Sequence, residues 1–153
     1  MTRALLSGLV IASLASACDD PTGPRDPVDI AYAAELNVDF SRMTKTDTGL
    51  WYEDITIGTG PAVTAGDRVR VLYMGWLANG TLFDSNDDAD DPLEFRVGLG
   101  QVIPGWDEGL LDMRPGGVRK LIIRPGLGYG SRAQGTIPAN STLVFSITLL
   151  GYQ

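Results

Sequence analysis

Apolar and polar residues alternate with a period of two over much of the chain from residue 50 onward, and this pattern restricts the fold most. Within VRVLYMGW, Val69, Val71 and Tyr73 fall on one face of an extended strand, and the alternate positions fall on the other. Within TLVFSITL, one face collects four apolar residues, namely Leu143, Phe145, Ile147 and Leu149. Alternation of this kind is typical of strands that are half buried.

Further strand candidates follow the same rule and are separated by turn signals. The candidates are LWYEDITI (50–57), TLFDS (81–85), LEFRV (93–97) and VRKLIIR (118–124). The turn signals, rich in Gly, Pro and Asn, are residues 58–61, 78–80, 115–117 and 125–126. Short strands joined by tight turns predict a mostly antiparallel sheet.

One segment in this region, Pro104 to Met113, breaks the strand rhythm. Proline suits the first helical turn because its missing N–H is not needed there, and Asp107 and Glu108 suit the positive end of the helix dipole. We therefore expect one short helix across the concave face of the sheet, which is an α+β arrangement.

The first residues, MTRALLSGLVIASLASAC, contain Arg3, then an apolar run, then small residues. The run is too short for a permanent membrane span and has the layout of a secretory signal peptide, which we place at residues 1–17. Cys18 follows LASA and resembles the lipidated cysteine of bacterial lipoproteins, although Ala15 stands where that motif prefers Leu. We expect lipidation of Cys18; cleavage that leaves a free thiol is the alternative.

Two short segments connect this leader to the strand-rich region. Residues 18–29 include DDPTGPRDPVD, which has three prolines and almost nothing apolar, so we expect an extended tether. Residues 30–48 form an N-terminal extension in which a short helix around Ile30 to Asn37 is expected to dock on the domain edge. The folded domain is then residues 49–153.

Composition excludes several functions. The 153 residues, 44% of them hydrophobic, fit one compact domain with short appendages. A net charge of −7 with scattered Lys and Arg argues against nucleic-acid binding. With no His and one Cys, the chain offers no zinc site, no intrachain disulfide and no Cys-His or Ser-His catalysis, and we expect no metal or cofactor.

The order of five stretches within Gly49 to Tyr152 resembles the FKBP-type peptidyl-prolyl cis-trans isomerases. The stretches are VRVLYMGWLANGTLFDS, PLEFRVG, QVIPGWDEGL, RKLIIRPGLGYG and IPANSTLVFSITLL. One of them alone would be weak, but five in this order are specific. The resemblance implies a half-barrel, a strongly curved antiparallel sheet around one short central helix, in agreement with the pattern above.

The resemblance also implies a proline-binding pocket and the residues that form it. The implied catalytic residues are Tyr73, Phe83, Asp84, Tyr129 and Phe145. The implied substrate-binding residues are Leu93, Gln101, Val102, Ile103, Trp106 and Ile137. From composition alone Trp106 fits a core position as well as a pocket floor, and the two roles do not conflict.

Ile103 has a physical reason to present its backbone to a ligand. A residue before proline is pushed toward extended geometry, so the Ile103 N–H lies outside the helix and is free for a ligand carbonyl. An X–Pro bond rotates slowly because twisting destroys amide resonance, a barrier of about 20 kcal/mol. A pocket that binds the twisted amide better than the planar one accelerates rotation without a nucleophile.

Asp84 in FDS has two interpretations: a carboxylate of the pocket, as the resemblance implies, or a residue that ends a strand and starts a turn. The loop NDDADDP has no Arg or Lys where many family members carry one, so Asp84 lacks that basic partner. Its acidic residues are Asp87, Asp88, Asp90 and Asp91. If Asp84 is buried, they favour its neutral form. A calcium site is one alternative, but the acidic residues lack the Asp-x-Asp-x-Asp-Gly spacing of a dedicated calcium-binding loop. A solvated charged turn, which disfavours acidic client peptides, fits better.

The resemblance predicts a rotamase that assists the folding of exported, proline-containing polypeptides and that macrolide inhibitors of the family can bind. We expect it in the cell envelope, periplasmic or on the outer face of a membrane, anchored by lipid at Cys18. A non-catalytic proline-peptide binding module and a periplasmic folding chaperone of the same fold are the alternatives. The segment Ser131 to Ser141 leaves no room for the large insert of chaperone-type relatives.

Overall fold

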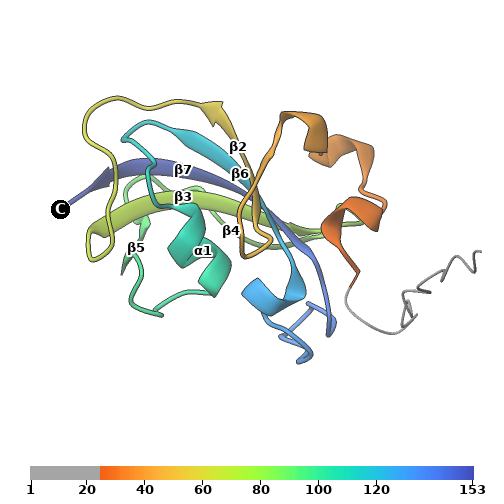
Figure 1. Cartoon of the computed structure of the whole chain (residues 1–153). Coiled ribbons are helices and arrows are strands. Elements are labelled where there is room, and N and C mark those ends of the chain that lie inside the picture. The colour runs from red at the N-terminus through yellow and green to blue at the C-terminus, as the bar shows by residue number, and fades with distance from the viewer. Residues whose placement is uncertain (1–24) are drawn as a thin grey trace, which may run out of the picture.

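The computed structural model describes residues 25–153 (Figure 1). Its strands are β1 (Thr44–Lys45), β2 (Trp51–Thr56), β3 (Arg68–Leu77), β4 (Leu82–Asn86), β5 (Leu93–Arg96), β6 (Val118–Ile123) and β7 (Leu143–Tyr152). One α-helix, α1, spans Pro104–Gly109. Four 3-10 helices are η1 (Pro27–Asp29), η2 (Ala34–Leu36), η3 (Phe40–Arg42) and η4 (Pro125–Leu127).

All seven strands belong to one antiparallel sheet in the order β1-β2-β6-β7-β3-β4, with β5 also paired to β3. The long strand β3 pairs with β7 along one side. On its other side, the first half of β3 pairs with β5 and the second half pairs with β4. The two sequence stretches with the clearest alternation therefore form the centre of the sheet.

The predicted alternation is confirmed by burial. Val69 and Val71 of β3 are fully buried, and all four apolar residues on the predicted inner face of β7 are buried. Each predicted strand is present within one to three residues of its expected bounds. The two-residue strand β1 was not predicted, because two residues are too few to show a period.

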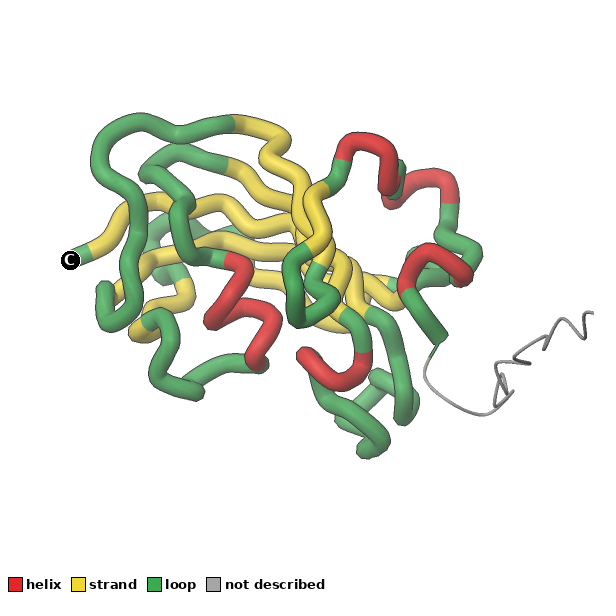
Figure 2. The backbone as a smooth tube through the Cα atoms, viewed as in Figure 1, coloured by secondary structure: helices red, strands yellow, loops and turns green. Residues whose placement is uncertain are grey.

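The helix α1 lies against the concave face of the sheet (Figure 2), so the fold is the expected curved α+β half-barrel. Close packing requires glycine: a Cβ at Gly105 would lie 2.7 Å from Ile123, and one at Gly109 would lie 2.7 Å from Leu121. The helix ends at Gly109 and not at Met113 as expected. Asp112 has a φ of 65°, so residues after Gly109 turn back toward the sheet and cannot continue the helix.

The N-terminal extension differs from the expectation of one helix over residues 30–37. It forms separate 3-10 turns, and Asn37 ends η2 in the left-handed conformation. The Ala33 N–H donates to the Ala78 carbonyl at 2.8 Å, which is a tertiary bond and not a helical one. A helix here would have few apolar residues to bury, whereas a folded-back chain satisfies its polar groups against the domain.

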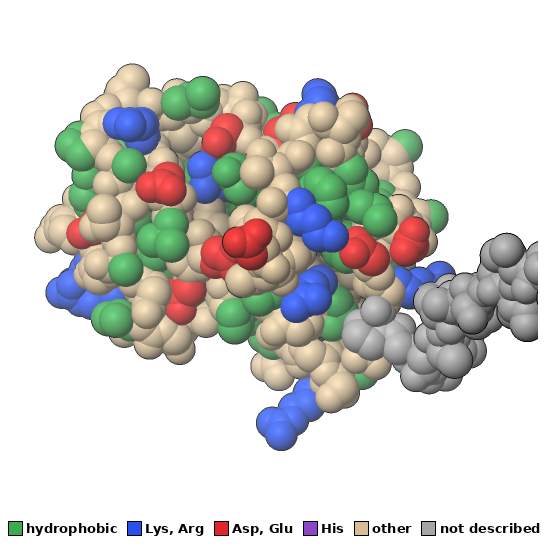
Figure 3. Space-filling view, viewed as in Figure 1, with side chains coloured by type: hydrophobic (Ala, Val, Ile, Leu, Met, Phe, Trp, Pro, Cys, Tyr) green, Lys and Arg blue, Asp and Glu red, His purple; other side chains and the backbone are tan. Residues whose placement is uncertain are grey.

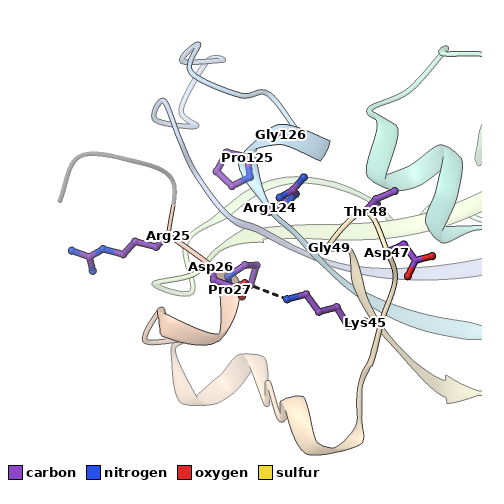
Figure 4. A pocket seen from close by; sticks show the side chains of 10 residues that line it. All are labelled: Arg25, Asp26, Pro27, Lys45, Asp47, Thr48, Gly49, Arg124, Pro125 and Gly126. Atoms are coloured by element: carbon purple, nitrogen blue, oxygen red, sulfur yellow. Dashed lines mark hydrogen bonds and ion pairs between the residues drawn. The ribbon is translucent and has the colours of Figure 1, made fainter. Parts of the chain in front are cut away.

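The end of the expected tether also differs from the prediction. Residues 27–29 form η1, Pro27 is buried, and Asp26 caps Val28. The carboxylate of Asp26 pairs with Lys45 of β1 at 3.2 Å (Figure 4). Proline and aspartate are both frequent at the start of a helical turn, so the same composition that predicts a tether also permits a cap. The expected signal peptide, Cys18 and the first residues of the tether lie outside the described residues.

The sheet has a second apolar cluster on its convex face. Leu36 and Met43 of the extension are buried against Ile122 of β6 and Val144 of β7. Both strand residues point away from α1, because their neighbours Leu121 and Phe145 face it. The extension therefore covers a face of the sheet rather than its edge. Within residues 25–153 no helix has the length and apolar character that a membrane span requires.

Candidate functional site

A cavity of about 200 Å³ opens between the N-terminus of α1, the inner face of the sheet and two loops. It is lined by Tyr73, Phe83, Asp84, Leu93, Gln101, Val102, Ile103, Trp106, Tyr129 and Phe145. These are ten of the eleven predicted site residues of the domain. They come from β3, β4, β5, β7, the helix α1, the loop before it and the turn after η4, so only the tertiary fold brings them together.

The eleventh residue, Ile137, does not line this cavity. It is 6% exposed and belongs to the main core, and its backbone bridges to Gln134. Ile137 is thus a core residue beside the site, and its role as a pocket wall stays a prediction.

Four aromatic rings form the walls and floor of the cavity. Trp106 is 4% exposed, and its ring centroid lies 5.0 Å from Tyr73 and 5.2 Å from Phe145, both edge to face. Phe83 meets Phe145 edge to face at 5.5 Å. Edge-to-face pairs are the preferred geometry of aromatic rings, so the rings hold one another in place. Trp106 is at once a core residue and the cavity floor.

Gly75 makes this aromatic wall possible, although the sequence pattern did not single it out. A Cβ at Gly75 would lie 2.6 Å from Phe145 Cε1 and 2.8 Å from Phe83 Cζ. The glycine sits on β3 between the strands that carry these two rings, β4 and β7. Its missing side chain lets both rings lie over the strand.

Ile103 has the backbone geometry that its position before proline predicts. Its φ of −60° and ψ of 147° are extended, and its carbonyl accepts from the Trp106 N–H at 2.9 Å. Among residues 25–153, no protein acceptor bonds the Ile103 N–H. A donor at the rim of an apolar cavity is therefore available to a ligand carbonyl.

The loop before α1 is held by two side chains whose role sequence reasoning missed. Asp107 accepts from the N–H groups of Gly98 and Gly100, each at 2.8 Å. The Gln101 side chain accepts from the Arg96 N–H at 2.7 Å. The sequence offered one sign of this role, namely an aspartate in the predicted helix shortly after two glycines. These three hydrogen bonds fix the loop that presents Val102 and Ile103 to the cavity.

Asp84 lies at the rim of the cavity and is exposed. The neutral form was expected only for a buried Asp84, and that condition is not met. The Tyr73 hydroxyl donates to its Oδ2 at 2.8 Å. Among the described residues no Lys or Arg pairs with Asp84, and the tyrosine takes the place of a basic partner.

Both hydroxyl groups of the site remain protonated at physiological pH. Burial is the main reason that the pKa of Tyr73 is raised to about 12, and the bond to Asp84 and its charge add to the effect. Burial, then the charge of Asp84, raises the pKa of Tyr129 as well. Tyr73 and Tyr129 therefore act as hydrogen-bond donors rather than as acids or bases.

The acidic loop between β4 and β5 is a chain of turns. Asn86 Nδ2 donates to the Asp91 carbonyl at 2.9 Å, and the Asp90 N–H donates to Asp88 Oδ1 at 2.9 Å. The side chains of the four loop aspartates are exposed. In the described part of the chain, no three acidic, Cys or His residues are grouped as a metal would require.

Arg119 supports the opposite end of α1, and sequence reasoning missed it. The side chain is buried and donates from its Nη1 to the carbonyls of Gly109 and Leu111, both at 2.9 Å. Its Nε and Nη2 bind the two carboxylate oxygens of Asp54 at 2.7 and 3.0 Å. The signal was an arginine at an inward position of the alternating strand β6.

On the face shown in Figure 3, Lys and Arg side chains are scattered among Asp and Glu and form no continuous basic patch. Among the described residues that line the cavity, Asp84 carries the one charged side chain, and the others are apolar, aromatic or neutral. The arrangement can bind an apolar ring and donate hydrogen bonds, and it contains no nucleophile paired with a base.

Comparison with known proteins agrees with this chemistry. A family model described as FKBP-type peptidyl-prolyl cis-trans isomerase matches residues 60–150. The FK506-binding protein of Neisseria meningitidis serogroup B is 48% identical over 103 residues, which are 67% of this chain and 94% of that protein. FK506-binding protein 4 of Chaetomium thermophilum is 52% identical over 106 residues, 69% of this chain but only 22% of that longer protein.

Solved structures show the same fold. The crystal structure of FkpA from Escherichia coli matches with a TM-score of 0.68 and 41% identity, over 78% of this chain and 55% of that one. The crystal structure of AtFKBP13 matches with a TM-score of 0.67 and 37% identity, over 72% of this chain and 98% of that one. The half-barrel and its aromatic cavity thus define a peptidyl-prolyl isomerase. The chain belongs to the FKBP-type peptidyl-prolyl cis-trans isomerase family.

Proposed function

We propose that this isomerase accelerates X–Pro rotation by seating the proline ring on Trp106, among the rings of Tyr73, Phe83 and Phe145. The observation that carries the proposal is the cavity of about 200 Å³ in which these rings meet, beside an Ile103 N–H that no acceptor in the described part of the chain bonds. The planar amide is more dipolar than the twisted one, so an apolar cavity with little water favours the twisted form. No covalent step or cofactor is needed.

Polar groups at the rim assist the rotation. The Ile103 N–H binds a substrate carbonyl and fixes the peptide on one side of the rotating bond. The Tyr129 hydroxyl, kept protonated by its raised pKa, donates a hydrogen bond to a second carbonyl. Asp84, held by Tyr73, supplies a negative charge near the rotating amide. These groups act by position and polarity.

The acidic loop sets a client preference. The exposed aspartates between β4 and β5 begin three residues after Asp84, so they lie at the rim where flanking residues of a client pass. Basic or neutral residues around proline are favoured and acidic ones are disfavoured. Macrolide inhibitors that FK506-binding proteins accept would occupy the same aromatic cavity.

The clients are exported polypeptides, and the enzyme is held in the cell envelope by lipid at Cys18. The support for this part is the sequence alone: an apolar leader, LASA before the cysteine, and a proline-rich segment up to residue 24. One acyl chain gives only marginal membrane binding, so stable anchoring needs the several chains that bacterial lipoproteins carry. A tether of this kind keeps the domain near chains that emerge from the membrane.

The experiment is the catalysed cis-to-trans rate of short X–Pro peptides with basic, apolar or acidic residues before proline, using residues 19–153. We expect a clear rate increase, least for acidic peptides. Phe83→Ala and Asp84→Leu should each lower kcat/KM by about tenfold or more, since each removes a group of the cavity. Leu82→Ala, a change at the exposed neighbour on β4, is the matched control and should leave the rate unchanged.

Each alternative has its own outcome. Wild-type activity in Asp84→Leu would mean that the carboxylate is a turn residue. Binding of proline peptides without any rate increase would identify a binding module. Suppression of aggregation without isomerase activity would favour the chaperone.

A further inference from the structure

The strand β4, which carries Phe83 and Asp84, is an edge strand. Within residues 25–153 its sheet neighbour is β3 alone, and the pairing shifts register between Gly75 and Trp76. Three of its five residues are exposed, so little side-chain packing holds it in place. An edge strand with one neighbour and little burial needs support at its ends if its side chains are to stay in position.

The N-terminal extension provides contacts at the start of this strand. The Ala33 N–H donates to the Ala78 carbonyl at 2.8 Å, in the turn that joins β3 to β4. On the same turn, Gly80 faces the extension: a Cβ there would overlap the carboxylate of Glu35 and lie 3.0 Å from the Ala33 Cβ. Residues 33–35 therefore hold this turn by one hydrogen bond and by direct packing.

The extension is itself fixed to the sheet, so its contact with the turn is a firm one. Leu36 is buried in the cluster on the convex face. Lys120 Nζ donates to the carbonyls of Leu36 and Asn37, both at 2.8 Å. Before the extension, Asp26 pairs with Lys45 of β1, as the dashed line in Figure 4 shows. Contacts of η2 with β6 and of β1 with β2 thus fix the segment on both sides of its turns.

We propose that Ala33 and Glu35 are positioning residues of the isomerase: they hold the 78–81 turn and thereby set the place of Phe83 and Asp84 at the cavity. Phe83 follows Gly80 by three residues, at most about 10 Å along the chain, so a displaced turn moves the strand at the site. The proposal rests on the catalytic roles proposed above for Phe83 and Asp84. It makes the extension a working part of the enzyme, although that segment lies outside the family match.

Proline substitution tests the hydrogen bond with little other change. Ala33 has φ −61° and ψ 139°, which a proline adopts without strain. Ala33→Pro removes the N–H and puts a methylene against the Ala78 carbonyl. The matched control is Ala34→Pro, one residue on. Proline is tolerated at the first residue of a helical turn, Ala33 already has the extended geometry required before proline, and the Ala34 N–H bonds no described backbone group.

Three quantities are measured: kcat/KM, the amide hydrogen exchange of β4, and the ionisation of Tyr73. The ionisation is followed by NMR of labelled tyrosine, and the Tyr73 signal is assigned with the Tyr73→Phe variant. For Ala33→Pro we expect kcat/KM to fall by about threefold to tenfold, as loss of one hydrogen bond permits. Exchange should rise in β4 but not in β6 or β7. Tyr73 should ionise at lower pH as Asp84 moves away from it. Ala34→Pro should change each readout by less than about twofold, or not at all.

Glu35→Ala is the second variant, at an exposed side chain whose loss leaves every backbone bond intact. It should change the same readouts in the same direction but less, and it keeps the test available if Ala33→Pro does not fold. Unchanged activity and unchanged β4 exchange in the folded variants would overturn the proposal. So would a loss shared equally by Ala34→Pro, or exchange that rises throughout the sheet. A wild-type chain without isomerase activity would instead refute the proposed function.

Discussion

Replacement of Arg119 by Met tests how strongly one buried side chain holds the central helix to the sheet. Arg119 is 6% exposed, and its guanidinium makes five contacts: two with Asp54, two with backbone carbonyls at and just after the end of α1, and one with the face of Tyr52 at 4.5 Å. Methionine reproduces the apolar stem of arginine as far as the position of Nε, so the change removes the donors and the charge and keeps the packing of the stem.

The size of the expected loss of stability depends on which hydrogen-bond acceptors lose the donor that Arg119 provides. The Gly109 carbonyl is buried and the Leu111 carbonyl is partly buried, and an unsatisfied group of this kind costs about 1–3 kcal/mol. Asp54 is 35% exposed and regains water, so its pair contributes at most about 1 kcal/mol. Stacking on Tyr52 adds about 0.5–1 kcal/mol. Relief of the guanidinium's own desolvation offsets part of this. We expect a loss of about 3 kcal/mol in the free energy of unfolding.

The assay is equilibrium unfolding in urea. With an m-value of about 1.5 kcal/mol/M, a loss of about 3 kcal/mol lowers the midpoint by about 2 M without a change in m. Arg119→Lys keeps the charge but not the fork of donors, and should lose about half as much. Arg70→Met is the control, because this β3 arginine is 42% exposed and, within residues 25–153, pairs only with Glu94; it should lose less than about 0.5 kcal/mol. If Arg119→Met is no more destabilising than Arg70→Met, the reasoning is wrong.

Two further predictions concern the ionisation of the site and the N-terminus. At pH 10.5 Tyr73 should be only about 3% ionised, because its pKa of about 12 favours the neutral phenol; that contribution to stability is complete below pH 10 and is lost as pH rises through 12. Asp84→Asn should lower the pKa of Tyr73 while leaving it above 10, since burial is the larger cause, and a pKa unchanged in NMR titration would show that the hydrogen bond has no effect. Cys18→Ser should leave the chain unprocessed or release it into the soluble fraction of cells; unchanged processing and membrane attachment would refute lipidation.

Most of the fold could be predicted because its signals are local. Alternating burial along β3 and β7 follows directly from the period of two, and Pro104 with the following acids starts the helix where the sequence indicates. The length of α1 was overestimated because apolar residues continue past Gly109. Leu110 and Met113 are buried all the same, but in a turn that Arg119 and the sheet stabilise.

The extension shows where local signals fail. Composition predicts a tether and a docked helix, whereas the structure has three 3-10 turns and a buried proline. The reason is that the Ala33, Leu36 and Asn37 backbones find partners on β6 and on the turn between β3 and β4. Those partners are more than 40 residues away in sequence. No sequence pattern within 15 residues of the extension predicts these contacts.

The aromatic residues of the cavity were expected from the resemblance to the family. The sequence by itself determined the strand periods, the helix start at Pro104 and the extended Ile103 before it. Each depends on a residue and its near neighbours, where steric and hydrogen-bonding preferences act. Only the tertiary structure decided that Ile137 is core, that Tyr73 is the partner of Asp84, that Gly75 admits two rings, and that the extension contacts the turn before β4. These depend on distances between segments far apart in the chain, and such distances are set by how the whole sheet curves around α1.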